Sequence, residues 1–277
     1  MPKLYPSVES APFVPATIRG AWERTADHVV RGMHSEPDRS GIGSPISVAS
    51  SENVSTTDYD VLLLRSISSP LAADHNFSGT VDVMMAVQES NAAADFSYYL
   101  HIYITQGTTD NLRGILIANH ADLLANEWGT TALGKSLSSP QSVMPVSALA
   151  GDRIVVEIGY RSRNTVTTSR TGTLWYGGNG TDLNAGGAPT SGIGYIDFSD
   201  AFTLSDSAAL RVTQAAVETL RRPTQSTLRM TQISVDALRR ADAANVRMTQ
   251  LAVEVLRKNG APISDNAFGG MLIVVAG

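Results

Sequence analysis

Few residues of this sequence have the type and spacing that catalysis or metal binding requires. The chain of 277 residues has no cysteine, so thiolate metal sites, disulfides and cysteine nucleophiles are excluded. Its histidines show none of the spacings of a zinc site, and no serine-nucleophile elbow or phosphate-binding loop occurs. We therefore expect no catalytic residues, no metal and no cofactor, and a protein that is not an enzyme. The histidines are His28, His34, His75, His101 and His120.

One loop resembles a metal-binding string. Residues 177–187 read GGNGTDLNAGG and contain the pattern G-G-x-G-x-D. In calcium-binding β-helices this string recurs, because successive turns share each ion. Here it occurs once, and Asn184 stands where an apolar residue is expected. The pattern favours a flexible loop, and calcium is the one metal that this loop would admit.

Aromatic side chains offer a second kind of site. The sugar rings of a glycan could stack on Trp128, Trp175 and Tyr176. Aromatic residues make up only 6% of the chain, so a place in the hydrophobic core is the competing interpretation for all three.

The composition points to a β-rich protein with a real core. Hydrophobic residues make up 43% of the chain and charged residues 17%, and the net charge of −5 does not suggest nucleic-acid binding. The longest apolar run, MLIVVA near the C-terminus, is far shorter than the roughly 20 residues of a membrane-spanning helix. The start of the sequence lacks the apolar stretch of a signal peptide, so we expect synthesis in a cytoplasm and no membrane span.

Alternation of apolar and polar residues predicts strands through the middle of the chain. In DRIVVEIGYR, Ile154, Val156 and Ile158 share one face, and Val81, Val83, Met85 and Val87 do so in GTVDVMMAV. Many short strands separated by turns predict an antiparallel, jelly-roll-like β-sandwich over residues 58–204. The predicted strands cover residues 59–65, 79–87, 98–105, 113–118, 152–161, 172–177 and 194–199.

Proline-rich residues 1–57 predict an extended N-terminal arm, with edge strands around residues 17–22 and 28–33. One helical turn or a short helix is expected within residues 118–125, before Trp128.

Three units with a period of 18 residues fill residues 205–263, ahead of a tail at 264–277. They contain LRVTQAAVETLRR, LRMTQISVDALRR and VRMTQLAVEVLRK. Alternation and Pro223 favour two short strands in each unit, whereas 18 residues also equal five helical turns, so helical repeats remain the alternative. The apolar positions expected to drive oligomerisation are Leu210, Val217, Leu220, Leu228, Val235, Leu238, Val246, Val253 and Leu256.

These units resemble the R-V/M-T-Q-x-x-V-E-V-L repeats near the C-termini of minor tail or fibre-like proteins of tailed bacteriophages. The resemblance covers about fifty residues and implies a virion structural protein without catalytic residues. A decoration or appendage of the phage head and a carbohydrate-binding receptor module are the alternatives.

The repeats also predict the partners. A two-stranded unit has one apolar face and cannot close a core alone, so other chains must cover it. Three copies around an axis would do so, and we expect a homotrimer that also contacts other virion proteins. Arg211, Arg229 and Arg247 could form a ladder with acidic residues of the same period, or simply a solvated face.

Overall fold

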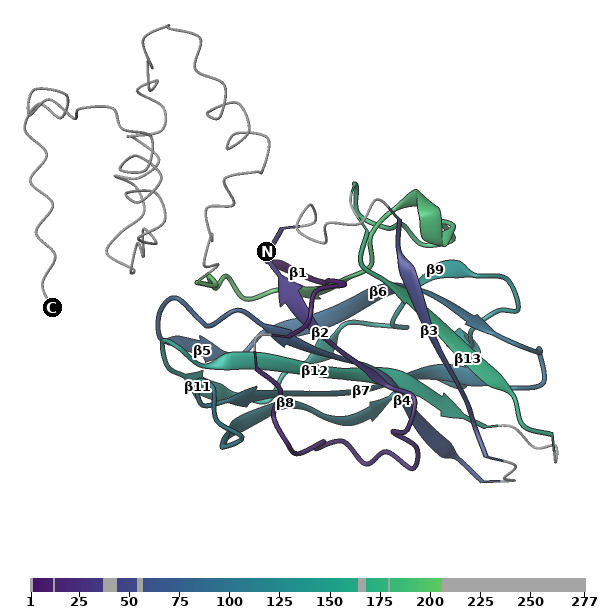
Figure 1. The fold of residues 1–277 in the computed structure, drawn as a ribbon, viewed down its shortest axis with the longest axis horizontal. Coiled ribbons are helices and arrows are strands. Elements are labelled where there is room, and N and C mark those ends of the chain that lie inside the picture. The colour runs from purple at the N-terminus through teal and green to yellow at the C-terminus, as the bar shows by residue number, and fades with distance from the viewer. Residues whose placement is uncertain are drawn as a thin grey trace, which may run out of the picture. The chain divides into compact units, whose positions relative to one another are not determined.

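The computed structural model describes residues 2–11, 13–36, 44–53, 57–163, 168–178 and 180–205, which form a β-sandwich (Figure 1). The mainly-β fold predicted from alternation is therefore confirmed for these residues. Each strand predicted between residues 58 and 204 is present. They are β4 (Tyr59–Ser68), β6 (Thr80–Glu89), β7 (Phe96–Thr105), β8 (Leu112–Ala121), β12 (Arg153–Ser162), β13 (Thr171–Tyr176) and β14 (Tyr195–Phe198).

One layer, which we call the β6 sheet, is built around strand β6. Strands β13 and β14 pair with successive parts of β6 along one side, and two short strands, β9 (Leu133–Ser136) and β10 (Gln141–Ser142), pair along the other. Strand β3 (Ile46–Ser51) pairs with β13 and ends the sheet. All of these pairs are antiparallel, as alternation over short, turn-separated strands predicts.

The other layer, the β12 sheet, has the order β2-β4-β12-β7-β8, where β2 is Val29–His34. Strands β2 and β4 run parallel, so the sandwich is mixed at this pair instead of wholly antiparallel. Strand β12 is bulged between Ile158 and Gly159, where a Cβ on Gly159 would lie 1.9 Å from the Val61 carbonyl oxygen. Only glycine permits this close approach of the two backbones.

The N-terminal region belongs to the sandwich. Strand β1 (Lys3–Pro6) pairs with β14 through its first half and with β2 through its second half, and so joins the two sheets. We expected edge strands here, but β1 and β2 both lie between other strands, and residues 17–22 form no strand. Of the helical turn or short helix expected at 118–125, only a 3-10 turn, Leu124–Asn126, is present, because β8 continues to Ala121.

Smaller elements complete the described part of the chain. A separate two-stranded sheet pairs β5 (His75–Phe77) with β11 (Val146–Ala148), and a 3-10 turn covers Pro189–Ser191.

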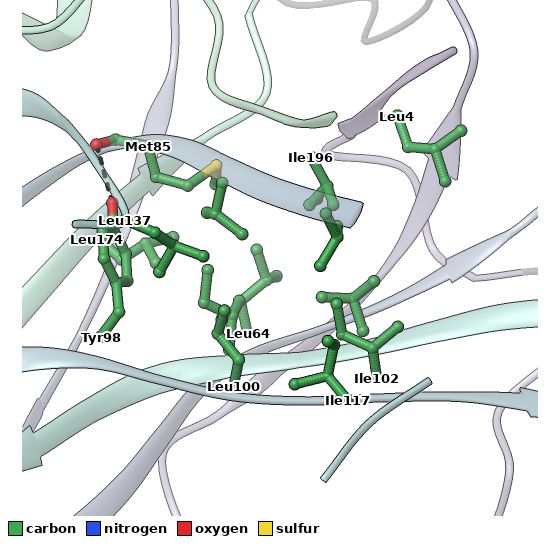
Figure 2. Packing of buried hydrophobic residues seen from close by; sticks show 14 of the residues in the cluster. Leu4, Leu64, Met85, Tyr98, Leu100, Ile102, Ile117, Leu137, Leu174 and Ile196 are labelled. Carbon is green, nitrogen blue, oxygen red and sulfur yellow. Dashed lines mark hydrogen bonds between the residues drawn. The ribbon is translucent and has the colours of Figure 1, made fainter. Parts of the chain in front are cut away.

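The core lies between the two sheets. Met85 of β6 and Leu100 and Ile102 of β7 meet there with no exposed surface (Figure 2). The Tyr98 hydroxyl donates to the carbonyl oxygens of Met85, at 3.2 Å, and Lys135, at 2.9 Å, and so links the layers. The two predicted inward faces are confirmed: Val81, Val83, Met85, Val87, Ile154, Val156 and Ile158 are all buried.

The outer face of the β12 sheet is buried as well, although alternation alone predicts that it faces water. Every residue of β7 is buried, on both faces. The covering segment is residues 13–24, which we call the strap. A second small apolar cluster of Ile67, Tyr103 and Val155 lies on this outer face, with Ala11 and Val30 packed against it.

Candidate functional site

The residues predicted to drive oligomerisation all lie outside the described residues. They are Leu210, Val217, Leu220, Leu228, Val235, Leu238, Val246, Val253 and Leu256. Their role and the choice between strands and helices in the repeats therefore stay predictions.

The three aromatic residues predicted as glycan contacts are not brought together as a platform. Trp128 is 0% exposed, and its ring packs against Tyr98 and Tyr160 at centroid distances of 5.5 and 5.6 Å. Tyr176 is also buried, and its hydroxyl accepts a hydrogen bond from Arg31 Nε at 3.1 Å. Trp175 is half-buried on β13. The structure thus places Trp128 and Tyr176 in the core, the competing interpretation, whereas Trp175 keeps part of its surface exposed.

Within the loop expected to admit calcium, Asp182 serves another purpose. Its carboxylate accepts hydrogen bonds from Lys3 Nζ at 2.5 Å and from the Tyr5 hydroxyl at 2.8 Å. Burial raises the pKa of Asp182, but these two hydrogen bonds outweigh it and the pKa is lowered. The ammonium group of Lys3 occupies the place of a cation, so the loop is tied to strand β1. In the described ranges, no group of three His, Asp or Glu side chains is close enough to hold a metal ion.

The densest polar cluster of the described residues lies beneath the strap and centres on Glu157 of β12. This carboxylate is fully buried. It accepts hydrogen bonds from the backbone N–H groups of Arg19 and Gly20, from Trp22 Nε1 at 3.0 Å and from the Tyr103 hydroxyl at 3.2 Å. A buried carboxylate is tolerated only when its lone pairs are satisfied in this way.

Arg65 of β4 is the cationic partner in this cluster. It is directly opposite Glu157 in the β4–β12 register, and its Nε lies 3.4 Å from Glu157 Oε1. Its guanidinium donates to the carbonyl oxygens of Pro15, at 2.6 Å, and Thr17, and to the Tyr103 hydroxyl. Arg65 therefore binds the carbonyls of the strap, and Glu157 binds its amides.

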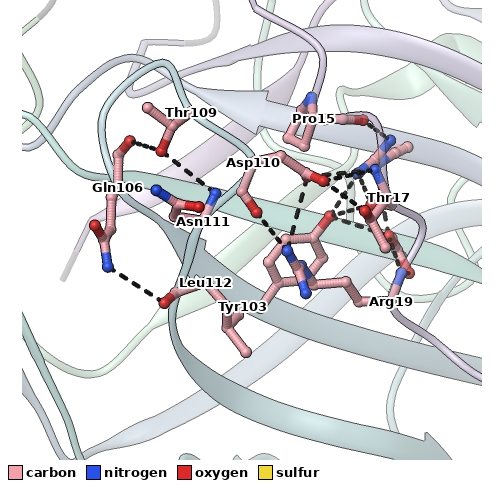
Figure 3. A network of polar contacts seen from close by, with 11 residues as sticks. Pro15, Thr17, Arg19, Tyr103, Gln106, Thr109, Asp110, Asn111 and Leu112 are labelled. Atoms are coloured by element: carbon pink, nitrogen blue, oxygen red, sulfur yellow. Dashed lines mark hydrogen bonds and ion pairs between the residues drawn. The ribbon is translucent and has the colours of Figure 1, made fainter.

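A second anchor holds the strap to the β7–β8 turn (Figure 3). Asp110 accepts hydrogen bonds from the Thr17 hydroxyl at 2.5 Å and the Thr17 amide, and Arg19 lies 3.7 Å from the same carboxylate. The hydrogen bond from Thr17 is the main reason why the pKa of Asp110 is lowered. The strap is thus held at two points by charged groups of two strands, β4 and β12, and of the β7–β8 turn.

His101 on β7 faces Glu157 from the other side, opposite it in the β7–β12 register. It is 2% exposed, and its Nδ1 lies 3.1 Å from Asn119 Oδ1, which also accepts from the Ala21 amide. Burial lowers the pKa of His101, so the neutral ring is favoured. This agrees with a structural histidine on a strand.

This arrangement fixes a segment of backbone. Glu157 and Arg65 are both buried, and most of their hydrogen bonds join the main chain of the strap. Sequence reasoning missed both residues. The available signal was a charged residue beside an apolar run in each strand: Arg65 follows VLLL, and Glu157 stands between IVV and IG.

Glu89 at the end of β6 is a buried acid with a raised pKa. It is 1% exposed, and only its Oε2 accepts a hydrogen bond, from the Phe96 amide at 3.2 Å. Burial raises its pKa to about 7, and the negative charges of Glu127 and Asp95 add to the rise.

Glu89 should therefore make the wild-type protein less stable as the pH rises toward 8. The folded state holds a proton that the unfolded chain releases near its ordinary pKa of 4.5, so stability is lost between that pH and about 7. Glu89→Gln should remove this loss of unfolding free energy, which is at most about 1.4 kcal/mol per pH unit. Urea denaturation between pH 5 and pH 8 measures the difference; a matched control, Glu23→Gln at an exposed site, should follow the wild-type profile. Parallel profiles for Glu89→Gln and wild type would contradict this assignment.

Comparison with known proteins identifies no family. No family model and no curated protein matches the chain. Among solved structures, a selenomethionine-labelled α-amino acid ester hydrolase is similar over 64% of this chain and 35% of its own, with a TM-score of 0.34 and 11% identity. A CocE/NonD family hydrolase from Staphylococcus aureus is similar over 70% of this chain and 40% of its own, with a TM-score of 0.30 and 9% identity. The chain thus spans well under half of either hydrolase, and likeness at this level carries no conclusion about activity.

Where the structure describes the chain, no helix has the length and hydropathy needed to cross a membrane.

Proposed function

We propose that this chain is a non-enzymatic structural protein of a bacteriophage particle, a tail or fibre-like component that assembles through its C-terminal repeats. The observation that carries the proposal is the 18-residue period, in which arginine, threonine, glutamine, valine and leucine recur at fixed positions three times. A repeat of this kind in one short segment suits a role in assembly. Decoration of the phage head is the alternative within the same class.

The sandwich domain adds support of a different kind. Two of its buried charged residues, Arg65 and Glu157, bind the strap of the same chain. Because both the carbonyl and the amide groups of the strap are hydrogen-bonded, we expect the sandwich to be rigid. A component of a particle requires such rigidity. In this proposal the repeats attach the protein to the particle, and the sandwich is the part that the particle displays.

Truncation tests the proposal. The cut belongs after Ser205, because the Leu204 backbone bridges to Leu71 and the Ser205 amide donates to the Pro70 carbonyl. We expect the truncated protein to sediment as a monomer in analytical ultracentrifugation, and the full chain as a trimer. The reason is that the apolar face of a two-stranded repeat needs other chains to cover it.

A full-length control separates loss of the repeats from loss of length. Val217→Asp, Val235→Asp and Val253→Asp together keep the chain length and should abolish the trimer. The corresponding changes of Thr213, Thr231 and Thr249 to serine should leave it intact. A full-length chain that stays monomeric at micromolar concentration would count against assembly through the repeats, and electron microscopy of labelled particles would distinguish tail from head.

A further inference from the structure

A hollow of about 360 Å³ lies on the β6 sheet, away from the strap. Its floor is strand β9 with Val87 of β6, and its walls are the segment around Asn126 to Thr131 and the loop at Ala185 and Gly186. The volume falls in the range of pockets that hold small molecules. No residue of the strap lines this hollow.

The loop wall is built into the fold. Gly134 of β9 exchanges hydrogen bonds with the loop, donating to the Gly187 carbonyl at 2.7 Å and accepting from the Gly186 amide at 2.8 Å. A Cβ on Gly134 would lie 2.3 Å from the Asn184 carbonyl oxygen, so only glycine lets the loop come this close. The hollow therefore has a fixed side and is more than a gap between loose segments.

Three polar groups around the hollow are free to form hydrogen bonds with a ligand. Asn126 Nδ2 donates to Asp122 Oδ2 at 2.7 Å and to the Ser136 carbonyl at 2.8 Å, which fixes the amide and leaves its Oδ1 as an acceptor. Within the described residues, this Oδ1 and the hydroxyls of Thr131 and Ser136 have no hydrogen-bond partner. Lys135 Nζ, the single charged group of the lining, donates to the Glu127 carbonyl.

The groups that line the hollow indicate which class of ligand it can bind. One ammonium group that is already bound to a carbonyl is too little charge for a phosphate, and the lining holds no aromatic ring on which a base could stack. Neutral acceptors and hydroxyls beside the apolar side chains of Val87, Leu133 and Ala185 match a ligand with hydroxyl edges and C–H faces. We propose that this hollow binds a saccharide.

Saturation-transfer NMR on the full-length protein tests this, with methyl glycosides of hexoses, N-acetylhexosamines and hexuronic acids at millimolar concentration as probes. We expect transfer to at least one probe. Thr131→Val with Ser136→Ala removes only hydroxyl groups and should weaken that binding at least tenfold. If the probe is a uronic acid, Lys135→Met should weaken it as well.

A matched pair of changes at exposed sites outside the hollow, Thr108→Val with Ser147→Ala, should leave binding unchanged. Circular dichroism confirms that each variant is folded. Absence of transfer to every probe from the folded wild-type protein would overturn the proposal. So would a Thr131→Val, Ser136→Ala variant that binds as wild type does.

Discussion

Val156→Asp is expected to leave the sandwich domain unfolded at room temperature. Val156 is 0% exposed in the middle of β12, between β4 and β7, and its side chain is in the core between the two sheets. The new carboxylate would have no partner there, and its burial costs several kcal/mol, which is comparable to the whole stability of a domain. Loss of the β-sheet circular dichroism signal and of a cooperative melting transition measures the effect.

A matched substitution separates burial from the change of residue type. Val14 lies in the strap and is 49% exposed, so Val14→Asp should change the free energy of unfolding by no more than about 0.5 kcal/mol. If Val156→Asp gave a soluble protein that melts as the wild type does, the face of β12 that we place in the core would have to be assigned differently.

Glu157→Ala should have the second-largest effect and should also release the strap. The change leaves the Arg65 guanidinium, which is 2% exposed, without its carboxylate, and leaves the Gly20 amide and Trp22 Nε1 without an acceptor. Breaking a buried ion pair by removing one partner costs about 3–5 kcal/mol. Urea denaturation measures the loss, and faster tryptic cleavage after Arg19 and Arg24 reports release of the strap.

The control for this prediction is an exposed ion pair. Asp58 lies 3.2 Å from Arg161 with a side chain that is 54% exposed, and Asp58→Ala should cost less than about 1 kcal/mol. Arg161 keeps its two hydrogen bonds to Asp60 in that variant. Equal losses for Glu157→Ala and Asp58→Ala would show that burial of the Glu157 cluster adds nothing to stability.

Most of the strands could be predicted from the sequence, because each is a local pattern. Alternation in DRIVVEIGYR places Ile154, Val156 and Ile158 on one face whatever the strand pairs with, and all three are buried. The same reasoning failed for the short strands β9 and β10, which are four and two residues long and are strands because β6 lies beside them. Nor could it decide the place of Trp128, since an aromatic ring suits a surface platform and a core equally well.

The sequence by itself determined the β class, the inward faces of the long strands, the absence of thiol chemistry and the 18-residue period. Only the tertiary structure decided that Glu157 and Arg65 face each other, that the strap covers them, and that Gly134 and Asn126 shape one hollow. The reason is physical. Strand faces follow from neighbours one or two residues apart, whereas Gly20 and Glu157 are 137 residues apart and meet only after the sheets have formed.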